Sequence, residues 1–179
     1  MPEAKEDLRY PIGRFEFNEQ TTPAQHETWI SAIAEAPARL KSAVDGLTDE
    51  QLDHPYRDGG WTVRQVAHHL LDSHMNSYVR VRRALTEDTP EVAGYDENLW
   101  AQLPDALKSP ISDSLLALEG VHARWVTLLH AMSAEQYARK MRHSAMGLVS
   151  LEKTLALYAW HGAHHVAHIT ALRSRKGWG

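Results

Sequence analysis

The sequence predicts an all-α protein, a four-helix bundle with short extra helices in the long connections. Three observations support this prediction. Apolar residues recur at three- and four-residue steps through four long segments. Ser or Thr followed three residues later by Gln, a pattern typical of helix starts, occurs at 48–51, 62–65 and 133–136. No series of alternating apolar and polar residues predicts a sheet, and we expect a single domain covering residues 1–179.

The first half of the chain is predicted to hold two of the long helices. Residues 1–20 show no sustained period and are expected to form an irregular leader. The first long helix is predicted from residue 22 or 23 to about residue 44, and Pro37 inside it predicts a kink or two abutting helices. The second is predicted from residue 62 to about residue 85. A short helix is expected at 96–102, within the connection 86–111.

The second half is predicted to repeat this plan. The third long helix is expected from residue 112 or 113 to about residue 132, and the fourth from residue 150 to about residue 176. Residues 142–149 are expected to form a turn or a short hairpin. GLTDEQL follows the first helix as AMSAEQY follows the third, a weak repeat that suggests two helical hairpins packed into one bundle.

Composition limits the classes of function. The 179 residues are 43% hydrophobic with a net charge of −4, and the acidic and basic residues are mixed, so no basic surface is expected for nucleic acid or an anionic membrane. No apolar run reaches about 18 residues, and the N-terminus lacks the apolar segment of a signal peptide. The chain has no cysteine. We therefore expect a cytoplasmic protein, and any metal must be bound by His, Asp or Glu.

Histidine is the unusual residue, with 12 in the chain and four in the segment HGAHHVAH. An advance of about 100° per residue places His161, His165 and His168 on one stripe with Leu157 and Leu172, and this stripe is expected to face the core. His161 and His165 are four residues apart and can bind one ion from the same side, which is the spacing of helical zinc sites. For each of them, an uncharged core histidine is the alternative.

A third ligand is expected on the second long helix, in AHHLLDSH. His69 lies on a polar stripe with Gln65 and Asn76, at the flank of the apolar face, which suits a ligand in a wet cleft between helices. The alternative is that this stripe is solvent-exposed. His68 and His74 point elsewhere on the helix and cannot share an ion with His69. His164 lies at the margin of the stripe on the last helix, and surface or packing roles are expected for five further histidines, His26, His54, His122, His130 and His143.

Three segments of the chain resemble a known family. YPIG (10–13), PYRDGGWTVRQVAHHLLDSHMNSY (55–78) and LALYAWHGAHHVAHIT (155–170) resemble the DinB-like metalloprotein superfamily, and within it the YfiT group of metal-dependent hydrolases. The resemblance covers nearly the whole chain. It implies a four-helix bundle, commonly a homodimer, that binds one divalent ion per subunit, zinc or nickel, through three histidines. These fall here on His69, His161 and His165, the three that the helix geometry also selects.

A site with three imidazole ligands predicts catalysis. Such a site leaves a coordination position for water or substrate, and bound water with a pKa lowered toward about 7 can attack an electrophilic centre. We therefore expect a metal-dependent hydrolase of a small molecule. Asp72 and Tyr158 are the candidates for a general acid or base, with a salt bridge and core packing as their respective alternatives. Gln65, Asn76 or His168 are expected to orient the imidazoles.

Two other functions stay open at this point. The resemblance also implies a thiol S-transferase, in which the same ion activates a low-molecular-weight thiol such as bacillithiol or mycothiol, and the substrate would bring the sulfur that this chain lacks. The second alternative is a non-catalytic, stress-related metal-binding bundle. It predicts a closed coordination shell and a large loss of melting temperature when the ion is chelated.

Overall fold

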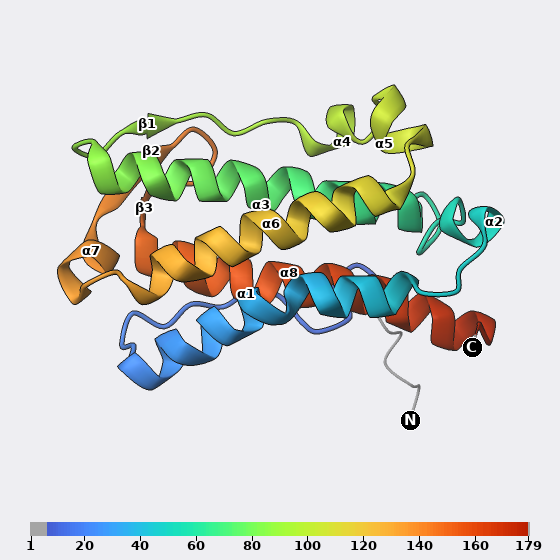
Figure 1. The fold of residues 1–179 in the computed structure, drawn as a ribbon, viewed down its shortest axis with the longest axis horizontal. Coiled ribbons are helices and arrows are strands. Elements are labelled where there is room, and N and C mark those ends of the chain that lie inside the picture. The colour runs from blue at the N-terminus through green and yellow to red at the C-terminus, as the bar shows by residue number, and fades with distance from the viewer. Residues whose placement is uncertain (1–6, 179) are drawn as a thin grey trace.

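Four long helices run along one axis of the molecule (Figure 1). The computed structural model describes residues 7–178. Its long helices are α1 (Pro23–Val44), α3 (Val63–Thr86), α6 (Ile111–His130) and α8 (Leu151–Lys176). They confirm the predicted four-helix bundle. The part of the expected leader at residues 7–20 forms no helix or strand, whereas residues 1–6 lie outside the described residues.

Capping residues set most of these helix starts. At α1, α3 and α8 the N-cap side chain accepts the backbone N–H of the residue three positions on, and these caps are Thr22, Thr62 and Ser150. The start of α6 differs from the prediction. It begins at Ile111, directly after Pro110, so the expected cap at Ser112 or Asp113 lies inside the first turn. Pro110 is the N-cap of α6, with an extended ψ of 133° and no side-chain cap hydrogen bond.

α1 passes through Pro37 as one continuous helix, so the alternative of two abutting helices is wrong. Pro37 has no N–H, and the carbonyl of Ile33, four residues earlier, therefore has no donor at its usual position in the helix. The ring of His122 on α6 donates to that carbonyl, with Nδ1 and O 2.6 Å apart. A neighbouring helix thus satisfies the backbone group that proline leaves open.

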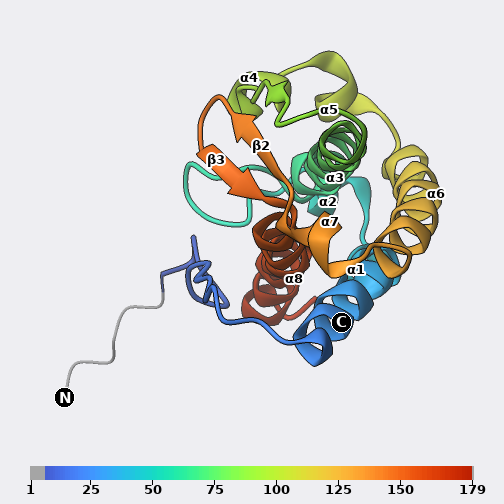
Figure 2. The same cartoon turned by 90° about the vertical axis from the view of Figure 1, so that its left-hand side faces the viewer.

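The helices follow one another around the bundle in the order α1, α6, α3, α8 (Figure 2). Each helix packs against the two neighbours in this order. α1 and α3 therefore lie diagonally opposite each other, and so do α6 and α8. The expected hairpins of consecutive long helices are wrong, because the connections 45–62 and 131–150 cross the ends of the bundle to the diagonal position.

Short elements fill the connections, as predicted. The short helices are α2 (Asp49–Leu52), α4 (Glu97–Trp100), α5 (Pro104–Lys108) and α7 (Ala134–Ala138). The expected hairpin is formed by β2 (Lys140–His143) and β3 (Gly147–Ser150), which pair in antiparallel fashion. A third strand, β1 (Glu91–Val92), pairs in parallel with β2 and was not predicted. Two residues are too few to show a strand period in the sequence.

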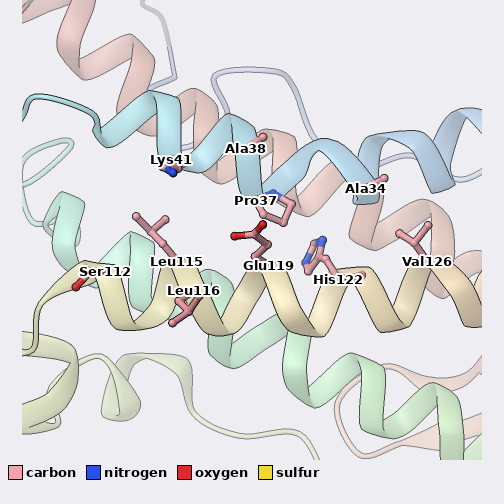
Figure 3. A pocket seen from close by; sticks show the side chains of 11 residues that line it. Ala34, Pro37, Ala38, Lys41, Ser112, Leu115, Leu116, Glu119, His122 and Val126 are labelled. Carbon is pink, nitrogen blue, oxygen red and sulfur yellow. The ribbon is translucent and has the colours of Figure 1, made fainter.

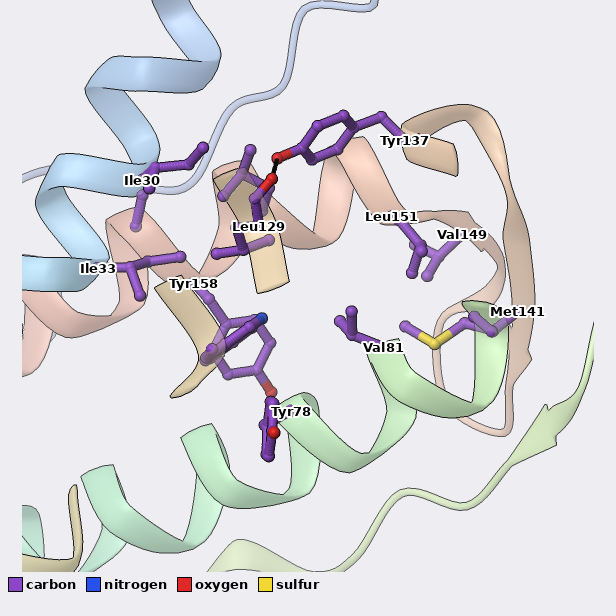
Figure 4. Packing of buried hydrophobic residues seen from close by; sticks show 14 of the residues in the cluster. Ile30, Ile33, Tyr78, Val81, Leu129, Tyr137, Met141, Val149, Leu151 and Tyr158 are labelled. Atoms are coloured by element: carbon purple, nitrogen blue, oxygen red, sulfur yellow. Dashed lines mark hydrogen bonds between the residues drawn. The ribbon is translucent and has the colours of Figure 1, made fainter. Parts of the chain in front are cut away.

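The buried apolar side chains form two clusters with a layer of histidines between them. The cluster beside the sheet is shown in Figure 4 and includes Ile33, Tyr78, Leu129, Met141 and Leu151. The cluster toward the other end includes Leu40, Leu70, Leu118, Ile169 and Leu172. On α3 and α6, buried His74 and His122 lie between the residues of the two clusters. None of the helices at residues 7–178 combines the length and hydropathy needed to cross a bilayer.

Candidate metal centre

The first turn of α3 fixes the position of His69. Thr62 and Gln65 cap this turn reciprocally, since each side chain accepts the backbone N–H of the other residue. Gln65 also donates its Nε2 to the carbonyl of Ala101 at 2.7 Å, which ties the long connection after α3 back to this turn. His69 follows one turn later, and it is only 7% exposed. Its ring is therefore held inside the bundle near the end of the connection.

The other two histidines lie one turn apart on α8, which packs against α3. The ring centroids of His161 and His165 are 4.5 Å apart. Between them, Gly162 lets α8 approach α1 closely, because a Cβ at this position would lie 3.2 Å from the Cβ of Ala36. The glycine thus places the HxxxH segment against α1 on one side and toward α3 on the other.

The three side chains meet at one point between α3 and α8. His69, His161 and His165 each offer one ring nitrogen, and these nitrogens all lie within 4.8 Å of one another. The Nε2 atoms of His69 and His161 are 3.3 Å apart. The ring of His69 also lies edge-on to that of His165, with centroids 4.8 Å apart. One cation can therefore be reached by a nitrogen from each residue.

Burial keeps these rings uncharged. It lowers the pKa of His69 to about 4, and burial followed by the neighbouring histidines lowers the pKa of His161 and His165 well below the usual range. A neutral imidazole has a free lone pair on one nitrogen, whereas an imidazolium has none. The three rings are thus in the form that binds metal at neutral pH.

Trp61 covers one side of the cluster from the loop before α3. Its ring centroid lies 4.7 Å from that of His69 and 6.4 Å from that of His165, to which it is nearly parallel at 12°. Beside it is a pocket of about 290 Å³, whose lining includes Tyr10, Tyr56, Arg57, Trp61, Asn98 and His165. This pocket gives a small molecule access to one of the three histidines.

Asp72 and Tyr158 lie on the same two helices as the three histidines. Burial, with a smaller contribution from the charge of Asp105, raises the pKa of Asp72 to about 6. Asp72 forms no ion pair within residues 7–178, so the salt-bridge alternative is wrong. The Tyr158 ring packs 5.5 Å from that of His161, and its hydroxyl accepts a hydrogen bond from Ser73 at 3.4 Å. Tyr158 is also part of the apolar cluster beside the sheet.

The residues expected to orient the imidazoles have other partners. Gln65 is engaged in the helix cap and with Ala101. Asn76 donates to the backbone carbonyl of Asp72, and His168 donates its Nε2 to the carbonyl of Arg9. The expectation that these three orient the three histidines through hydrogen bonds is therefore wrong.

His74 contacts Nδ1 of His161, the ring nitrogen that points away from His69, and the sequence prediction missed this residue. His74 is 0% exposed, and its Nε2 lies 3.1 Å from Nδ1 of His161. Its Nδ1 lies 2.9 Å from Nε2 of His122, which is also buried. One signal was present in the sequence: His74 falls on the apolar face of its helix, where a polar ring needs a buried partner.

A second hollow lies away from the three histidines, between α1 and α6 (Figure 3). Its volume is about 570 Å³, and its lining includes Pro37, Lys41, Leu115, Glu119 and His122. Figure 3 shows His122 on α6 facing α1 beside Pro37. The lining of this hollow includes His122 but none of the three converging histidines.

Comparison with known proteins agrees with this architecture. A family model described as the DinB superfamily matches residues 32–169. The chain belongs to the DinB superfamily. This DinB-superfamily chain is 49% identical to "Putative metal-dependent hydrolase YfiT" of Bacillus subtilis (strain 168). The alignment spans 173 residues and covers 96% of this chain and 97% of that protein. A "Putative metal-dependent hydrolase" of Bacillus cereus (strain 03BB102) is 49% identical over 172 residues, covering 96% of this chain and 99% of that protein.

Two solved structures resemble this member of the DinB superfamily. The structure of YfiT from Bacillus subtilis, described as "a probable metal-dependent hydrolase with an unusual four-helix bundle topology", superposes with a TM-score of 0.94 at 48% identity, covering 96% of this chain and 99% of that chain. TT2238, a four-helix bundle protein, superposes with a TM-score of 0.56 at 18% identity, covering 82% of this chain and 98% of that chain. The second likeness shows the fold alone.

Proposed function

We propose that this protein is a metal-dependent hydrolase in which His69, His161 and His165 bind one divalent ion, zinc or nickel. The observation that carries the proposal is the convergence of one nitrogen from each histidine within 4.8 Å. The names of the similar Bacillus proteins, which refer to metal-dependent hydrolases, support it.

The donor set suits such an ion. Imidazole nitrogen is a good ligand for zinc and nickel, and three protein ligands leave a position for water or substrate. When bound, the ion supplies a Lewis acid that polarises a substrate carbonyl and lowers the pKa of water. The protein contributes the fixed spacing of the rings, their neutral state and the partial cover that Trp61 gives on one side.

The proposed helpers are Asp72 and Tyr158. A carboxyl group with a pKa of about 6 can both take up and release a proton near neutral pH, which is the property a general acid or base needs. Tyr158 contacts His161 directly and is proposed to support the position of that ring and to offer its hydroxyl at the edge of the site. Both residues come from the helices that carry the ligands, so the helices set their distance from the ion.

The substrate is proposed to be a small molecule, because the pocket beside His165 measures only about 290 Å³. The protein is further proposed to act in the cytoplasm as a homodimer. Light scattering of the purified protein tests the dimer, since a dimer doubles the mass of 20.2 kDa expected for one chain. A measured mass of about 20.2 kDa at micromolar concentration would contradict the proposed dimer, but it would not bear on the proposed metal ligands.

The test starts from protein purified without an affinity tag. Metal analysis is expected to find about one zinc or nickel ion per chain, and His161→Ala is expected to lose it, whereas the exposed control His130→Ala keeps it. A panel of activated esters and amides is then incubated with the metal-loaded protein in the absence of thiol. Cleavage that disappears in His161→Ala supports the hydrolase. Retention of metal and activity in His161→Ala would contradict the proposal.

The same preparation distinguishes the alternative activity, a thiol S-transferase, from the hydrolase. The metal-loaded protein is mixed with a low-molecular-weight thiol and monochlorobimane, and the fluorescent conjugate is measured. Conjugation above background that requires His161, without thiol-independent cleavage of any ester or amide, would overturn the hydrolase in favour of the transferase. Both reactions would use the same three histidines, so only the dependence on thiol distinguishes them.

A further inference from the structure

A chain of hydrogen-bonded rings leads from His161 away from the metal centre and across the bundle. Nδ1 of His161 lies 3.1 Å from Nε2 of His74, and Nδ1 of His74 lies 2.9 Å from Nε2 of His122. Nδ1 of His122 then lies 2.6 Å from the carbonyl oxygen of Ile33. The chain takes one residue from each long helix, in the order α8, α3, α6 and α1.

The last group of the chain sets the direction of every bond in it. A carbonyl oxygen only accepts, so Nδ1 of His122 must carry the proton. His74 and His122 are 0% and 1% exposed, and their hydrogen-bond partners are other histidines and a backbone carbonyl rather than a carboxylate, so each is a neutral ring with one N–H. Nε2 of His122 therefore accepts from Nδ1–H of His74, and Nε2 of His74 accepts from Nδ1–H of His161. This leaves the lone pair of His161 on Nε2, the nitrogen that faces His69.

Pro37 explains why the Ile33 carbonyl can accept from a side chain. In an uninterrupted helix the N–H of residue 37 would bond to this carbonyl, but proline has no N–H. A proline inside a helix is costly, and here it lies next to His122 at the hollow between α1 and α6. The irregularity in α1 and the orientation of a ring on α8 are thus linked through two buried histidines.

We propose that Pro37, His122 and His74 are positioning residues of the metal centre, because together they hold His161 in the form that presents Nε2 to the ion. This inference rests on the proposed role of His161 as a ligand. A free neutral imidazole in water prefers its proton on Nε2, so a fixed acceptor at Nδ1 removes the form that cannot bind the ion through Nε2. Among the described residues, Nδ1 of His165 has no such partner.

The first test reads the protonated nitrogen directly. Long-range ¹H–¹⁵N correlation spectra of the imidazole rings, recorded on metal-free and zinc-loaded protein, are expected to show the Nδ1–H form for His74, His122 and His161. A spectrum with His74 or His122 in the Nε2–H form, or with either ring doubly protonated at pH 7, would overturn the proposal. This reading needs no activity, and on the metal-free protein it stands even if the hydrolase proposal fails.

The second test measures zinc affinity by competition with a chromophoric chelator. His122→Phe keeps a ring but removes both hydrogen bonds, and we expect it to weaken zinc binding about 10- to 100-fold, the effect usual for loss of a ligand's outer partner. His122→Gln, which can still donate and accept, is expected to recover most of the affinity. The matched control is His143→Phe, a buried histidine on β2 outside the chain of rings, which should leave affinity unchanged.

Equal zinc affinities for His122→Phe and His143→Phe would exclude a positioning role. Should His122→Phe fail to fold, His122→Gln and the spectra of the unsubstituted protein still decide the question. Failure of the unsubstituted protein to bind zinc or nickel at all would instead contradict the proposed function, and it is distinguished by the same titration.

Discussion

Arg64, in the first turn of α3, is joined to Asp53 through its Nε and the carboxylate Oδ1 at 2.6 Å. Its other nitrogens bind Asp49 at 2.9 Å and the carbonyl of Ser109 at 3.2 Å. The Arg64 side chain is only 8% exposed, whereas the carboxylates of Asp53 and Asp49 are 56% and 89% exposed. One buried guanidinium thus links α2 and the segment before α6 to the start of the helix that carries His69.

Removal of this guanidinium is expected to destabilise the bundle more than removal of either carboxylate. We expect Arg64→Ala to lower the free energy of unfolding by about 2–3 kcal/mol, because three charge-assisted contacts are lost. Asp49→Ala, which removes an exposed partner, is expected to cost at most about 0.5–1 kcal/mol. Urea unfolding of the two variants checks the order, and equal losses would show that the buried position of Arg64 is unimportant.

Gly162 and Gly120 form a matched pair for the packing of α8 against α1. At the exposed Gly120 a Cβ would meet nothing within 4 Å, so Gly120→Ala is expected to stabilise α6 by about 0.5–1 kcal/mol. At Gly162 the added methyl would lie 3.2 Å from Ala36 and 3.5 Å from a carbon of the His74 ring. We expect Gly162→Ala to be less stable than Gly120→Ala by about 1–3 kcal/mol in thermal or urea unfolding. Two equally stable variants would mean that α8 can move away from α1 freely.

The pKa of Asp72 predicts a pH dependence of stability in the metal-free protein. Because the folded-state pKa is raised to about 6, the folded protein holds this proton more tightly than the unfolded chain. The stability contributed by protonated Asp72 is complete below about pH 4 and is lost as the pH rises through about 6. Asp72→Asn has no carboxyl group to titrate and avoids this loss. Between pH 4 and pH 7.5 its free energy of unfolding is expected to rise by about 1–2 kcal/mol relative to that of the unsubstituted protein, a value reduced for the partial exposure of the carboxyl.

Urea unfolding in the presence of a chelator measures that difference at both pH values. The histidines and other titrating groups are common to the two proteins and cancel in the comparison. A difference that stays constant from pH 4 to pH 7.5 would show that Asp72 titrates as an ordinary exposed carboxyl group.

Removal of the ion is expected to leave the bundle folded. The two apolar clusters lie on either side of the histidine layer and are built without the metal, so chelation should preserve the helical circular dichroism. Zinc at about 100 times its dissociation constant is expected to add about 2.7 kcal/mol, which raises Tm by about 5–11 °C for a chain of this size. Unfolding upon chelation would favour the non-catalytic bundle with a structural ion.

The long helices and the three converging histidines could be predicted from the sequence, because both depend on periodicity along a single helix. An advance of about 100° per residue places His161 and His165 on one face whatever the neighbouring helices are, and the Thr62 cap marks the start of the helix that carries His69. The capping boxes at Thr48 and Ser133 likewise identified α2 and α7.

Relationships between helices could not be predicted in the same way. The diagonal placement of α1 and α3 depends on how the connections cross the bundle ends, and local spacing carries no information about this. The bond between His74 and His161 depends on the rotation and height of two helices from different halves of the chain. Pro37 was recognised as a disturbance of α1, but its partner His122 could be found only once α6 was placed beside it.

The pairing of the small sheet affects the alignment of the three histidines. β1 begins at Glu91, a short turn after α3 ends at Thr86, and β3 leads directly into α8, so the pairing of both with β2 connects the end of α3 to the start of α8. A slip of one residue in this ladder would translate a strand by about 3.3 Å. That step is as large as the whole gap between the facing nitrogens of His69 and His161, which is 3.3 Å. An insertion or deletion in these strands would therefore misalign the three rings while leaving every one of them in the chain.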